Sequence, residues 1–401
     1  MGGVILPRAA WRDHPGLARV VDALGAGNAR IVGGAVRDTL LGIDTADIDL
    51  ATTRAPEQVV DLLEAARIKA VPTGIKHGTI TAVASDEVYE VTTLRRDLET
   101  DGRHATVAFT DDWREDAARR DFTINALYAD PVSGEIFDYF GGIDDLHARR
   151  VRFIGDPLIR IAEDHLRILR FFRFLARFGD APDPDGLQAC TDRANDLMAL
   201  SRERIANELV RLLVAPNAVP TVRLMIDHGI FQPIIPEITD VDRFVRTVKL
   251  EAAAGILPSA LLRLVALLPS DAAESVGARL KLSNDDRKRM AVAAAPLLTP
   301  DVRILAYRLG GVGAHDQLLL SALPDEEILD GLQVLRDWTP PRLPVTGGQL
   351  VAKGLSAGPD VARTLRRIEN RWIAEGFPDA ARAGDIADDE VAQLLDAIKK
   401  S

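Results

Sequence analysis

The stretch of sequence that decides the fold is a glycine pair followed at a short interval by two aspartates: Val32-Gly33-Gly34-Ala35-Val36-Arg37-Asp38, then Asp47-Ile48-Asp49-Leu50-Ala51-Thr52. The pattern predicts a strand over residues 30–33, a short helix over 35–41 and a second strand over 48–52. Because side chains two apart project from the same face of a strand, Asp47 and Asp49 are expected to point together. Neighbouring carboxylates are costly unless positive charge neutralises them. The segment therefore predicts a divalent metal site at Asp47 and Asp49.

The chemistry that such a pair indicates is displacement at phosphorus. Two divalent ions are the usual apparatus for it, and we expect Mg²⁺, with Mn²⁺ as an alternative. The glycine pair lies between a strand and a helix, where backbone N–H groups can approach a triphosphate. Arg37, one turn into the helix, is placed to hold a phosphate oxygen. Neither the dinucleotide fingerprint nor the P-loop pattern is present.

The rest of the chain divides into a mixed part and a helical part. Up to about residue 140, short strands alternate with helices, including a predicted hairpin over 78–94; polar residues 96–112 are predicted to form a loop. Beyond residue 143 the patterns are helical, beginning with one helix predicted over 158–178. The predicted fold class is α+β, with a small mixed sheet and its helices followed by a long helical body and tail. The expected domains are a catalytic head (1–142), a neck (143–270), a body (271–337) and a tail (338–401).

Composition limits the partners and the compartment. The single cysteine, Cys190, excludes a disulfide framework within the chain, and no signal peptide or long apolar span is present, so we expect a protein of the reducing cytoplasm. The net charge of −11 argues against indiscriminate coating of nucleic acid. Residues 149–177 nevertheless hold eight arginines against three acids, a local basic segment that can meet a polyphosphate or an RNA backbone.

Three motifs together resemble one family. Residues 32–52 resemble the head signature of bacterial tRNA nucleotidyltransferases and their poly(A) polymerase relatives, a branch of the polymerase-β-like nucleotidyltransferases. A second motif is Glu115-Asp116 followed by Arg119-Arg120-Asp121-Phe122-Thr123-Ile124-Asn125-Ala126. A third is Glu163-Asp164-His165-Leu166-Arg167-Ile168-Leu169-Arg170 with Arg173. The resemblance continues through residues 201–213, 227–237 and 346–368, and so covers most of the chain.

The resemblance implies roles for individual residues of the first two motifs. Asp47 and Asp49 are the expected catalytic metal ligands. Gly34, Arg37 and Arg120 are expected to contact the incoming nucleotide. Asp121 and Asn125 are expected to be structural. Glu90, on a strand expected beside the metal site, is the candidate auxiliary carboxylate.

The third motif suggests how a protein chooses a base. Helix positions three and four apart share a face, so Asp164, Arg167 and Arg170 are expected to form a ladder that Arg173 continues. A carboxylate accepts hydrogen bonds and a guanidinium donates them in a rigid fork, which matches the edges of cytosine and adenine. Uracil and guanine would leave buried polar groups unpaired. The resemblance gives this helix the template role, with all four side chains reaching the nucleotide.

The expected function is addition of CCA to the 3′ end of tRNA from CTP and ATP, with release of pyrophosphate. Three alternatives remain open: a poly(A) polymerase, an enzyme adding only CC or only A, and a non-catalytic RNA-binding relative. Residues 73–80 resemble the CCA-adding type, and both metal aspartates are present. A loop over 95–112, including Asp101-Gly102-Arg103-His104, favours the full activity.

The resemblance also implies partners beyond the nucleotides. The basic segment with Arg363, Arg366 and Arg367 is expected to contact tRNA. No protein partner, membrane or second phosphohydrolase site is expected.

Overall fold

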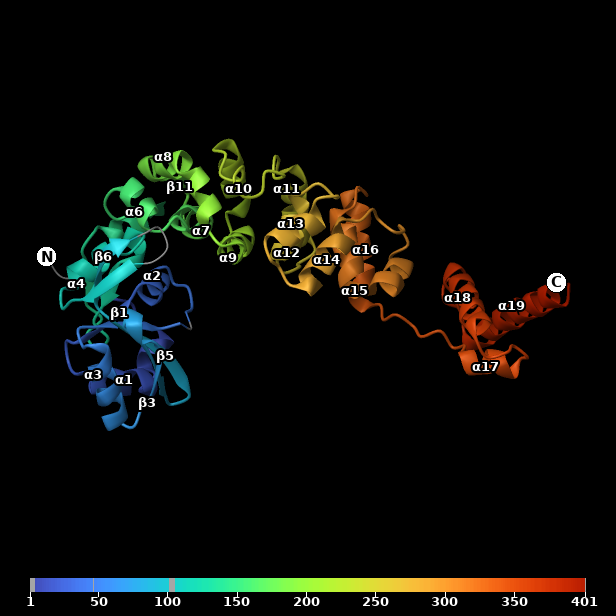
Figure 1. Cartoon of the computed structure of the whole chain (residues 1–401), viewed down its shortest axis with the longest axis horizontal. Helices are drawn as coiled ribbons and strands as arrows, with labels where there is room; N and C mark the ends of the chain where they lie inside the picture. The colour runs from blue at the N-terminus through green and yellow to red at the C-terminus, as the bar shows by residue number, and fades with distance from the viewer. Residues whose placement is uncertain (1–3, 46, 101–104, 401) are drawn as a thin grey trace. The chain divides into compact units, whose positions relative to one another are not determined.

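The computed structural model describes residues 4–45, 47–100 and 105–400, and the chain forms two compact units (Figure 1). The first unit comprises the chain up to residue 245 together with residues 258–287. The second comprises residues 246–257 and the chain from residue 288 onward. The expected α+β class is confirmed, because a mixed sheet with helices is followed by a mostly helical remainder.

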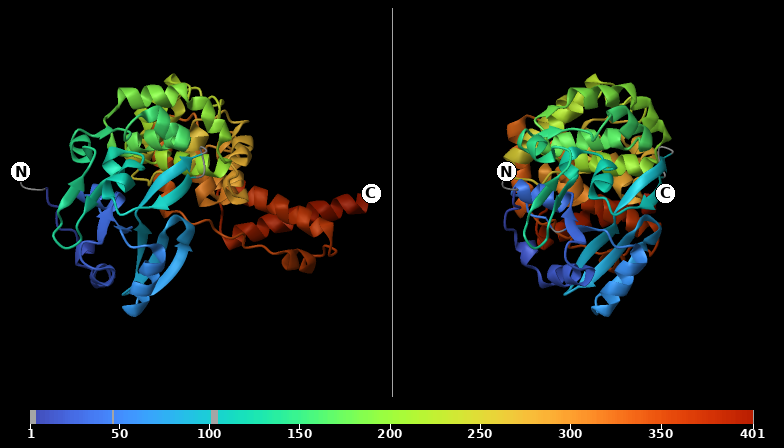
Figure 2. Two further views of the ribbon diagram at one scale, coloured as in Figure 1. Left: turned by 60° about the vertical axis from the view of Figure 1, so that its left-hand side comes forward. Right: turned by 90° about the vertical axis from the view of Figure 1, so that its left-hand side faces the viewer.

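A mixed sheet of seven strands organises the head, in the order β3-β4-β5-β2-β1-β8-β9 (Figures 1 and 2). Neighbouring strands pair antiparallel except β2 and β5, which are parallel. The strands are β1 (Ala29–Val32), β2 (Asp49–Thr52), β3 (Lys69–Gly74), β4 (Thr79–Ala84), β5 (Glu87–Thr93), β8 (Leu127–Ala129) and β9 (Ile136–Asp138).

Several helices pack against this sheet, and one of them follows a strand directly in the chain. Helices α1 (Pro15–Leu24) and α3 (Pro56–Ala65) pack on each other and on β4, burying Val20, Leu24, Val59 and Leu63 completely. Helix α2 (Gly34–Leu40) follows β1 directly through Gly33, whose φ of 70° favours glycine. A further cluster of buried residues joins the sheet to α4 (Trp113–Ala118): Val32, Ala51, Leu94, Ala117, Ala126, Tyr128 and Ile154.

The predicted loop over residues 96–112 was wrong in part. Strands β6 (Arg95–Thr100) and β7 (Ala105–Phe109) form an antiparallel hairpin, and the expected loop residues Asp101, Gly102, Arg103 and His104 lie outside the described residues. The apolar and β-branched residues of 105–109 favour an extended chain, although they show no clean alternation. Further on, β10 (Arg150–Val151) and β11 (Ala181–Pro182) form a short parallel pair where only helices were expected.

The expected single helix over 158–178 is two helices, α6 (Pro157–Glu163) and α7 (Arg167–Phe178). Asp164 ends the first, with extended φ and ψ of −150° and 106°. Its side chain accepts a hydrogen bond from the Leu166 backbone N–H at 3.1 Å, a local turn that competes with helix continuation. The periodicity of the sequence did not reveal this break, because apolar residues recur at helical spacing both before and after it.

The remaining helices of the first unit extend the packing around α7. They are α5 (Gly142–His147), α8 (Pro184–Asp192), α9 (Arg202–Leu213), α10 (Ala218–Asp227), α12 (Ala260–Ala266) and α13 (Ala273–Arg279). Of these, α9 and α10 pack on α7, α8 packs on α6, and α12 packs on α9. Buried aromatic rings tie α7 to the segment after α4: the Phe122 ring lies 4.9 Å from Phe153 and 5.2 Å from Phe174. This packing fixes α7 beside the residues that follow the second sequence motif.

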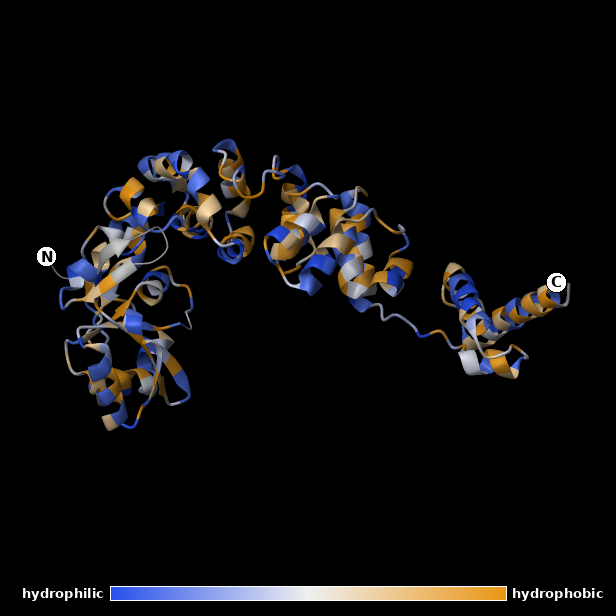
Figure 3. Cartoon of the chain, in the orientation of Figure 1, coloured by the Kyte–Doolittle hydropathy of each residue, from blue (hydrophilic) through white to orange (hydrophobic). Residues whose placement is uncertain are grey.

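The second unit is built from helices alone in its described part. Helices α11 (Asp242–Ala253) and α14 (Asn284–Ala294) cross its boundaries, and α15 (Val302–Leu320) and α16 (Asp325–Asp337) lie within it. After the proline-rich segment come α17 (Gly347–Ala352), α18 (Pro359–Ala374) and α19 (Ala380–Lys400), the last two side by side (Figure 2). Polar and apolar residues mix along the helices (Figure 3). No described helix is long and apolar enough to cross a membrane.

Candidate active site

The pair of aspartates predicted to bind metal lies at the start of β2. Asp49 is the first residue of the strand and is in register with Glu90 of β5. Asp47 precedes the strand instead of lying within it, yet the alternation holds: Asp47 is exposed, Ile48 is buried and Asp49 is half-buried. Asp47, Asp49 and Glu90 line one cavity of about 650 Å³, together with Asp86 of the β4–β5 turn and Glu87 at the start of β5. The expected pair and its auxiliary carboxylate therefore share one acidic cavity.

The electrostatics of this edge favour a cation. Burial raises the pKa of Asp49, and the neighbouring charges of Glu90 and Asp47 raise it further, against the opposing effect of Arg120. Among the described residues, no three His, Cys, Asp or Glu side chains converge into a ready-made metal cage. Divalent ions at nucleotide sites are often held by one or two carboxylates, with substrate phosphates and water completing the shell. The carboxylates of β2 and β5 fit that kind of site.

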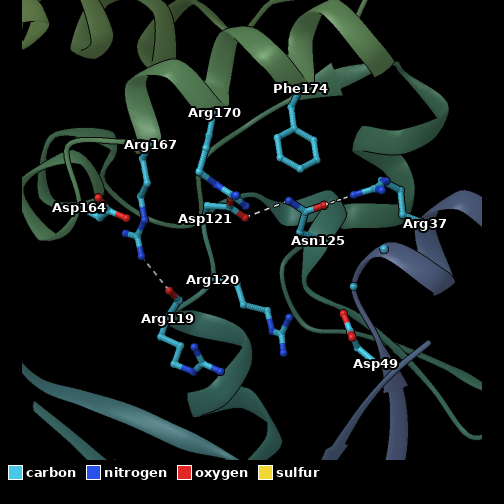
Figure 4. A pocket seen from close by; sticks show the side chains of 12 residues that line it. Arg37, Asp49, Arg119, Arg120, Asp121, Asn125, Asp164, Arg167, Arg170 and Phe174 are labelled. Carbon is cyan, nitrogen blue, oxygen red and sulfur yellow. Dashed lines mark hydrogen bonds and ion pairs between the residues drawn. The ribbon is translucent and has the colours of Figure 1, made fainter. Parts of the chain in front are cut away.

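A second cavity, of about 400 Å³, adjoins the first through Asp49 (Figure 4). It collects residues from α2, the end of α4, the segment after it and α7. Its lining is Gly33, Gly34, Arg37, Asp49, Arg119, Arg120, Asp121, Asn125, Asp164, Arg167, Arg170 and Phe174. Five arginines and a glycine turn beside an acidic edge make a cavity suited to a polyanion that also brings a cation.

One hydrogen-bonded chain crosses the cavity from α2 to α7 (Figure 4). The Arg37 Nη1 donates to Asn125 Oδ1 at 2.5 Å, Asn125 Nδ2 donates to Asp121 Oδ1 at 2.9 Å, and Arg170 Nε donates to Asp121 Oδ2 at 2.7 Å. Burial alone raises the pKa of Asp121, but Arg170 and Asn125 outweigh it and hold that pKa below its usual value. Asp121 and Asn125 thus tie the second motif to the head.

The base-selecting candidates reach the cavity from two directions. Arg167 and Arg170 lie on one face of α7, as their spacing predicted, and Asp164 reaches the cavity from the turn before that helix. Arg204 of α9 holds the Asp164 carboxylate, with Nη2 lying 2.8 and 3.0 Å from the two oxygens.

Arg167 makes three contacts inside the protein. Its Nη1 donates to Glu163 at 2.5 Å and to the Arg160 carbonyl at 2.9 Å, and its Nη2 donates to the Arg119 carbonyl at 3.1 Å. The guanidinium therefore bridges α6 and the end of α4.

Arg173 occupies a different place from its predicted partners. Its guanidinium is buried and pairs with Glu208 of α9, and it is not among the residues that line the cavity. One helical turn separates it from Arg170, and the side chain faces α9. Arg173 therefore joins α7 to α9.

The sequence reasoning missed two lining residues, Arg119 and Phe174. Arg119 ends α4, and its carbonyl accepts the hydrogen bond from Arg167. Phe174 follows Arg170 by four positions and Arg167 by seven, a helical spacing that places all three on one face. That spacing was available in the sequence, whereas the position of Arg119 depends on how α4 ends.

Comparison with known proteins agrees with this geometry. Residues 29–152 match the family described as "Poly A polymerase head domain", and residues 181–241 match "Probable RNA and SrmB- binding site of polymerase A". The mitochondrial CCA tRNA nucleotidyltransferase 1 of Danio rerio is 35% identical over 369 residues, covering 86% of this chain and 83% of the relative. The CCA-adding enzyme of Lactobacillus helveticus is 29% identical over 393 residues, covering 94% and 96%.

Among solved structures, the CCA-adding enzyme of Bacillus stearothermophilus in complex with CTP superposes with a TM-score of 0.76 at 27% identity, covering 96% of this chain and all of that one. Sequence and fold thus agree across the head and the helical parts alike. The chain belongs to the family of the CCA-adding tRNA nucleotidyltransferases.

Proposed function

We propose that this protein adds CCA to the 3′ end of tRNA, using CTP and ATP as substrates and releasing pyrophosphate. The observation that carries the proposal is the meeting of two cavities at Asp49: an acidic edge suited to cations, and an arginine-lined space that contains the base-selecting candidates. In the reaction, the tRNA 3′-hydroxyl oxygen forms a bond to the α-phosphorus of the nucleotide. The bond from that phosphorus to the bridging oxygen of the β-phosphate breaks, and pyrophosphate leaves.

Enzymes of this family generally use divalent metal ions, and here we propose two Mg²⁺ ions, with Mn²⁺ as an alternative. Asp47 and Asp49 would hold them, with Glu90 as the auxiliary carboxylate in register with Asp49. When bound, such ions favour deprotonation of the attacking hydroxyl and stabilise charge on the departing pyrophosphate. The raised pKa of Asp49 supports this assignment, because burial and the charges of Glu90 and Asp47 disfavour the ionised carboxylate and a bound cation would offset that cost.

The side chains of the second cavity have separate proposed roles. Gly34, Arg37 and Arg120 would border the triphosphate, since they line the cavity next to Asp49. Asp164 and Arg167 would meet the edge of the base, and Arg170 would support them through its pair with Asp121. Arg173 would act indirectly, by fastening α7 to α9 through Glu208.

The proposed division of labour along the chain follows from these positions. Residues 1–142 would form the catalytic head, 143–270 a nucleotide-selecting and RNA-binding neck, 271–337 a body, and 338–401 a tail that contacts tRNA. We place the activity in the cytoplasm, the compartment that a chain with one buried cysteine, Cys190, fits.

The test is extension of labelled tRNA transcripts that lack CCA, CA or A, with Mg²⁺ and each nucleoside triphosphate singly and in mixtures. We expect all three transcripts to be extended to CCA and no further. Extension that stops at CC, or that acts only on the transcript ending in CC, would identify a partial enzyme. Long A-tails on every transcript would identify a poly(A) polymerase, and a lack of any extension would leave a binding protein.

A further inference from the structure

We infer that Tyr128 is a positioning residue: its hydroxyl, with the Asp116 carboxylate, holds the Arg120 guanidinium so that one edge faces the nucleotide cavity. The inference rests on the proposed function, because Arg120 is one of the residues proposed to border the triphosphate. Tyr128 belongs to β8 and is completely buried, behind the cavity and outside its lining.

The contacts form a closed triangle of three side chains. Tyr128 donates its hydroxyl proton to Asp116 Oδ2 at 2.6 Å, and Arg120 Nε donates to the Tyr128 hydroxyl oxygen at 3.1 Å. Arg120 Nη2 donates to the same Asp116 oxygen at 3.2 Å. Two of the three nitrogens of this guanidinium are therefore fixed from behind.

The third nitrogen points to the cavity. Arg120 Nη1 lies 3.5 Å from the position that a Cβ on Gly33 would occupy, beside the glycine turn that opens α2. The Arg120 side chain is 20% exposed, and Nη1 makes no hydrogen bond to any of the described residues. Arg120 also lies close enough to Asp49 to lower its pKa. A cationic N–H edge between the glycine turn and Asp49 is where a triphosphate oxygen is expected.

The ring of Tyr128 has little freedom to move. Trp113 packs against it edge-on with ring centroids 5.7 Å apart, and Tyr139 does the same at 6.0 Å. Asp116, almost fully buried, also accepts from Arg119 Nε at 2.8 Å and from the Arg95 backbone N–H at 3.2 Å. Rigid packing of both partners makes the direction of the Arg120 guanidinium a fixed feature of the head, which is what a preorganised phosphate contact requires.

The same cluster offers a matched control. Tyr139 is a second tyrosine whose hydroxyl accepts a hydrogen bond from an arginine, Arg30, at 2.8 Å. The Arg30 guanidinium stacks on Trp113 and Phe137 and does not line either cavity at the active site. Tyr128→Phe and Tyr139→Phe thus remove the same atom from neighbouring rings, but only the first releases an arginine of the cavity.

The experiment measures CTP binding by calorimetry and steady-state kinetics of CTP addition, in the full chain. Tyr128→Phe is expected to raise both the Kd and the KM for CTP by about tenfold, the worth of one charged hydrogen bond, with kcat changed much less. Tyr139→Phe is expected to leave all three unchanged. Equal effects of the two substitutions, or a fall in kcat with Kd unchanged, would overturn the inference.

A double-mutant cycle tests whether Tyr128 acts through Arg120. In an Arg120→Ala background, Tyr128→Phe is expected to have no further effect on Kd, because the group it positions is gone. Additive losses would show that the hydroxyl acts by another route and would overturn the inference. If Tyr128→Phe lowers the Tm strongly, Arg120→Lys tests the same restraint from its other end: it keeps the charge, loses the fork that Tyr128 and Asp116 hold, and is expected to raise the Kd for CTP likewise. Since the calorimetry needs no turnover, failure of CCA addition by the wild type would overturn the proposed function alone.

Discussion

At the scale of single residues, Asp49 combines an unfavourable electrostatic environment with a proposed role in metal binding. Burial, Glu90 and Asp47 all raise its pKa, so the ionised form of this carboxyl is less favourable in the folded protein than in water. Carboxylates with perturbed pKa values in a cavity cluster at functional sites.

Asp49→Asn is therefore expected to lower kcat by at least about 1000-fold, since ligands of catalytic metals contribute several kcal/mol to the transition state. The Tm is expected to stay level or rise, because one of three crowded charges is removed. The control is Asp86→Asn, which removes a charge from the same cavity at a residue with φ 65°, a conformation that asparagine tolerates. An Asp49→Asn protein that retains turnover like this control would contradict the assignment of Asp49.

Asp164 is expected to govern which base is accepted. Asp164→Ala removes the acceptor that faces the cavity and leaves Arg204 without its partner, while the acidic edge at Asp49 stays intact. Misincorporation of UTP relative to CTP should rise by about tenfold or more, because unpaired polar groups at the base edge cost about 1–3 kcal/mol. The rate of CTP addition should change less. Competition assays with mixed nucleotides measure this, with Asp185→Ala on the exposed side of α8 as a control. An unchanged nucleotide preference would rule out the template role.

Asp116 links the active site to stability at low pH. Arg120 and Arg119 outweigh the effect of burial and lower the pKa of this carboxyl to about 2, from 3.8. A lowered pKa in the folded state stabilises the protein above the unfolded pKa, and this stabilisation is lost as pH falls toward the folded pKa. Asp116→Asn should therefore cost about 2 kcal/mol of unfolding free energy at pH 6, and the difference from wild type should shrink below about pH 4. Denaturant titrations at a series of pH values measure it; a difference that is independent of pH would contradict the ionised state.

At the scale of elements, helix α15 is kinked at a glycine whose positive φ, like that of Gly33, disfavours other residues. Gly310 has φ 73° and ψ 166° inside an otherwise helical segment, a combination that essentially only glycine adopts. Before the kink, Ile304 and Tyr307 pack on the core of the tail, whose buried members include Leu350, Ile368 and Trp372. After it, Asp316 pairs with Arg289 of α14. The kink therefore lets one helix serve two packing surfaces.

Gly310→Ala is expected to lower the unfolding free energy by about 1–3 kcal/mol, because a Cβ is strained at this φ and ψ. Gly311→Ala provides the matched control: it adds the same methyl group one residue later, at ordinary helical angles, and neither position has a heavy atom within 4 Å of the new carbon. The control should be neutral or slightly stabilising. Thermal and denaturant unfolding of both variants measures the contrast, and equal stabilities would contradict the strain argument.

The elements also show what the sequence could and could not predict. Alternation located β4, whose side chains are buried and half-buried in turn. The glycine pair after β1, the aspartates at the start of β2 and the polar turn before β5 located the other three strands, although β1 and β2 are almost entirely buried. The three-residue strand β8 was missed, since all three of its residues are buried and no alternation remains. The break at Asp164 was missed because it depends on a local side-chain turn and on Arg204, forty positions away in the chain.

Residues of the candidate site could be predicted where the spacing within a strand or a helix determines which side chains share a face. Asp47, Asp49, Arg167 and Arg170 were placed by strand and helix periods, and each lines a cavity at the site. Tyr128 and Arg204 were not found, because their roles arise from tertiary contacts between elements that no local period encodes. Arg173 has the helical spacing of the predicted ladder, but its side chain pairs with Glu208 of α9 instead of reaching the cavity.

At the scale of the whole molecule, the charge distribution bears on how an acidic protein binds RNA. The chain carries a net charge of −11, so any RNA-binding surface must be local. In α18, Arg367 and Arg371 pair with acids of α19. Arg363 pairs with Asp360 of its own helix but is 73% exposed, and Arg366 is exposed with no ion pair in the described part of the chain. Arg363 and Arg366 are thus the arginines of this helix most available to phosphate.

Replacing both with glutamate is expected to weaken tRNA binding and to reduce the slope of log Kd against log salt by about 1–2, one unit for each lost phosphate contact. CTP binding should be unchanged, since neither residue lines the cavities at the active site. The control replaces Arg8 and Lys69 of the head, which are also exposed, and so makes the same change in net charge. If both double variants weaken tRNA binding equally, net charge alone accounts for the effect. If only the tail variant does so, and its salt slope falls, phosphate contacts belong to α18, and the head can select nucleotides independently of how the tail holds the RNA.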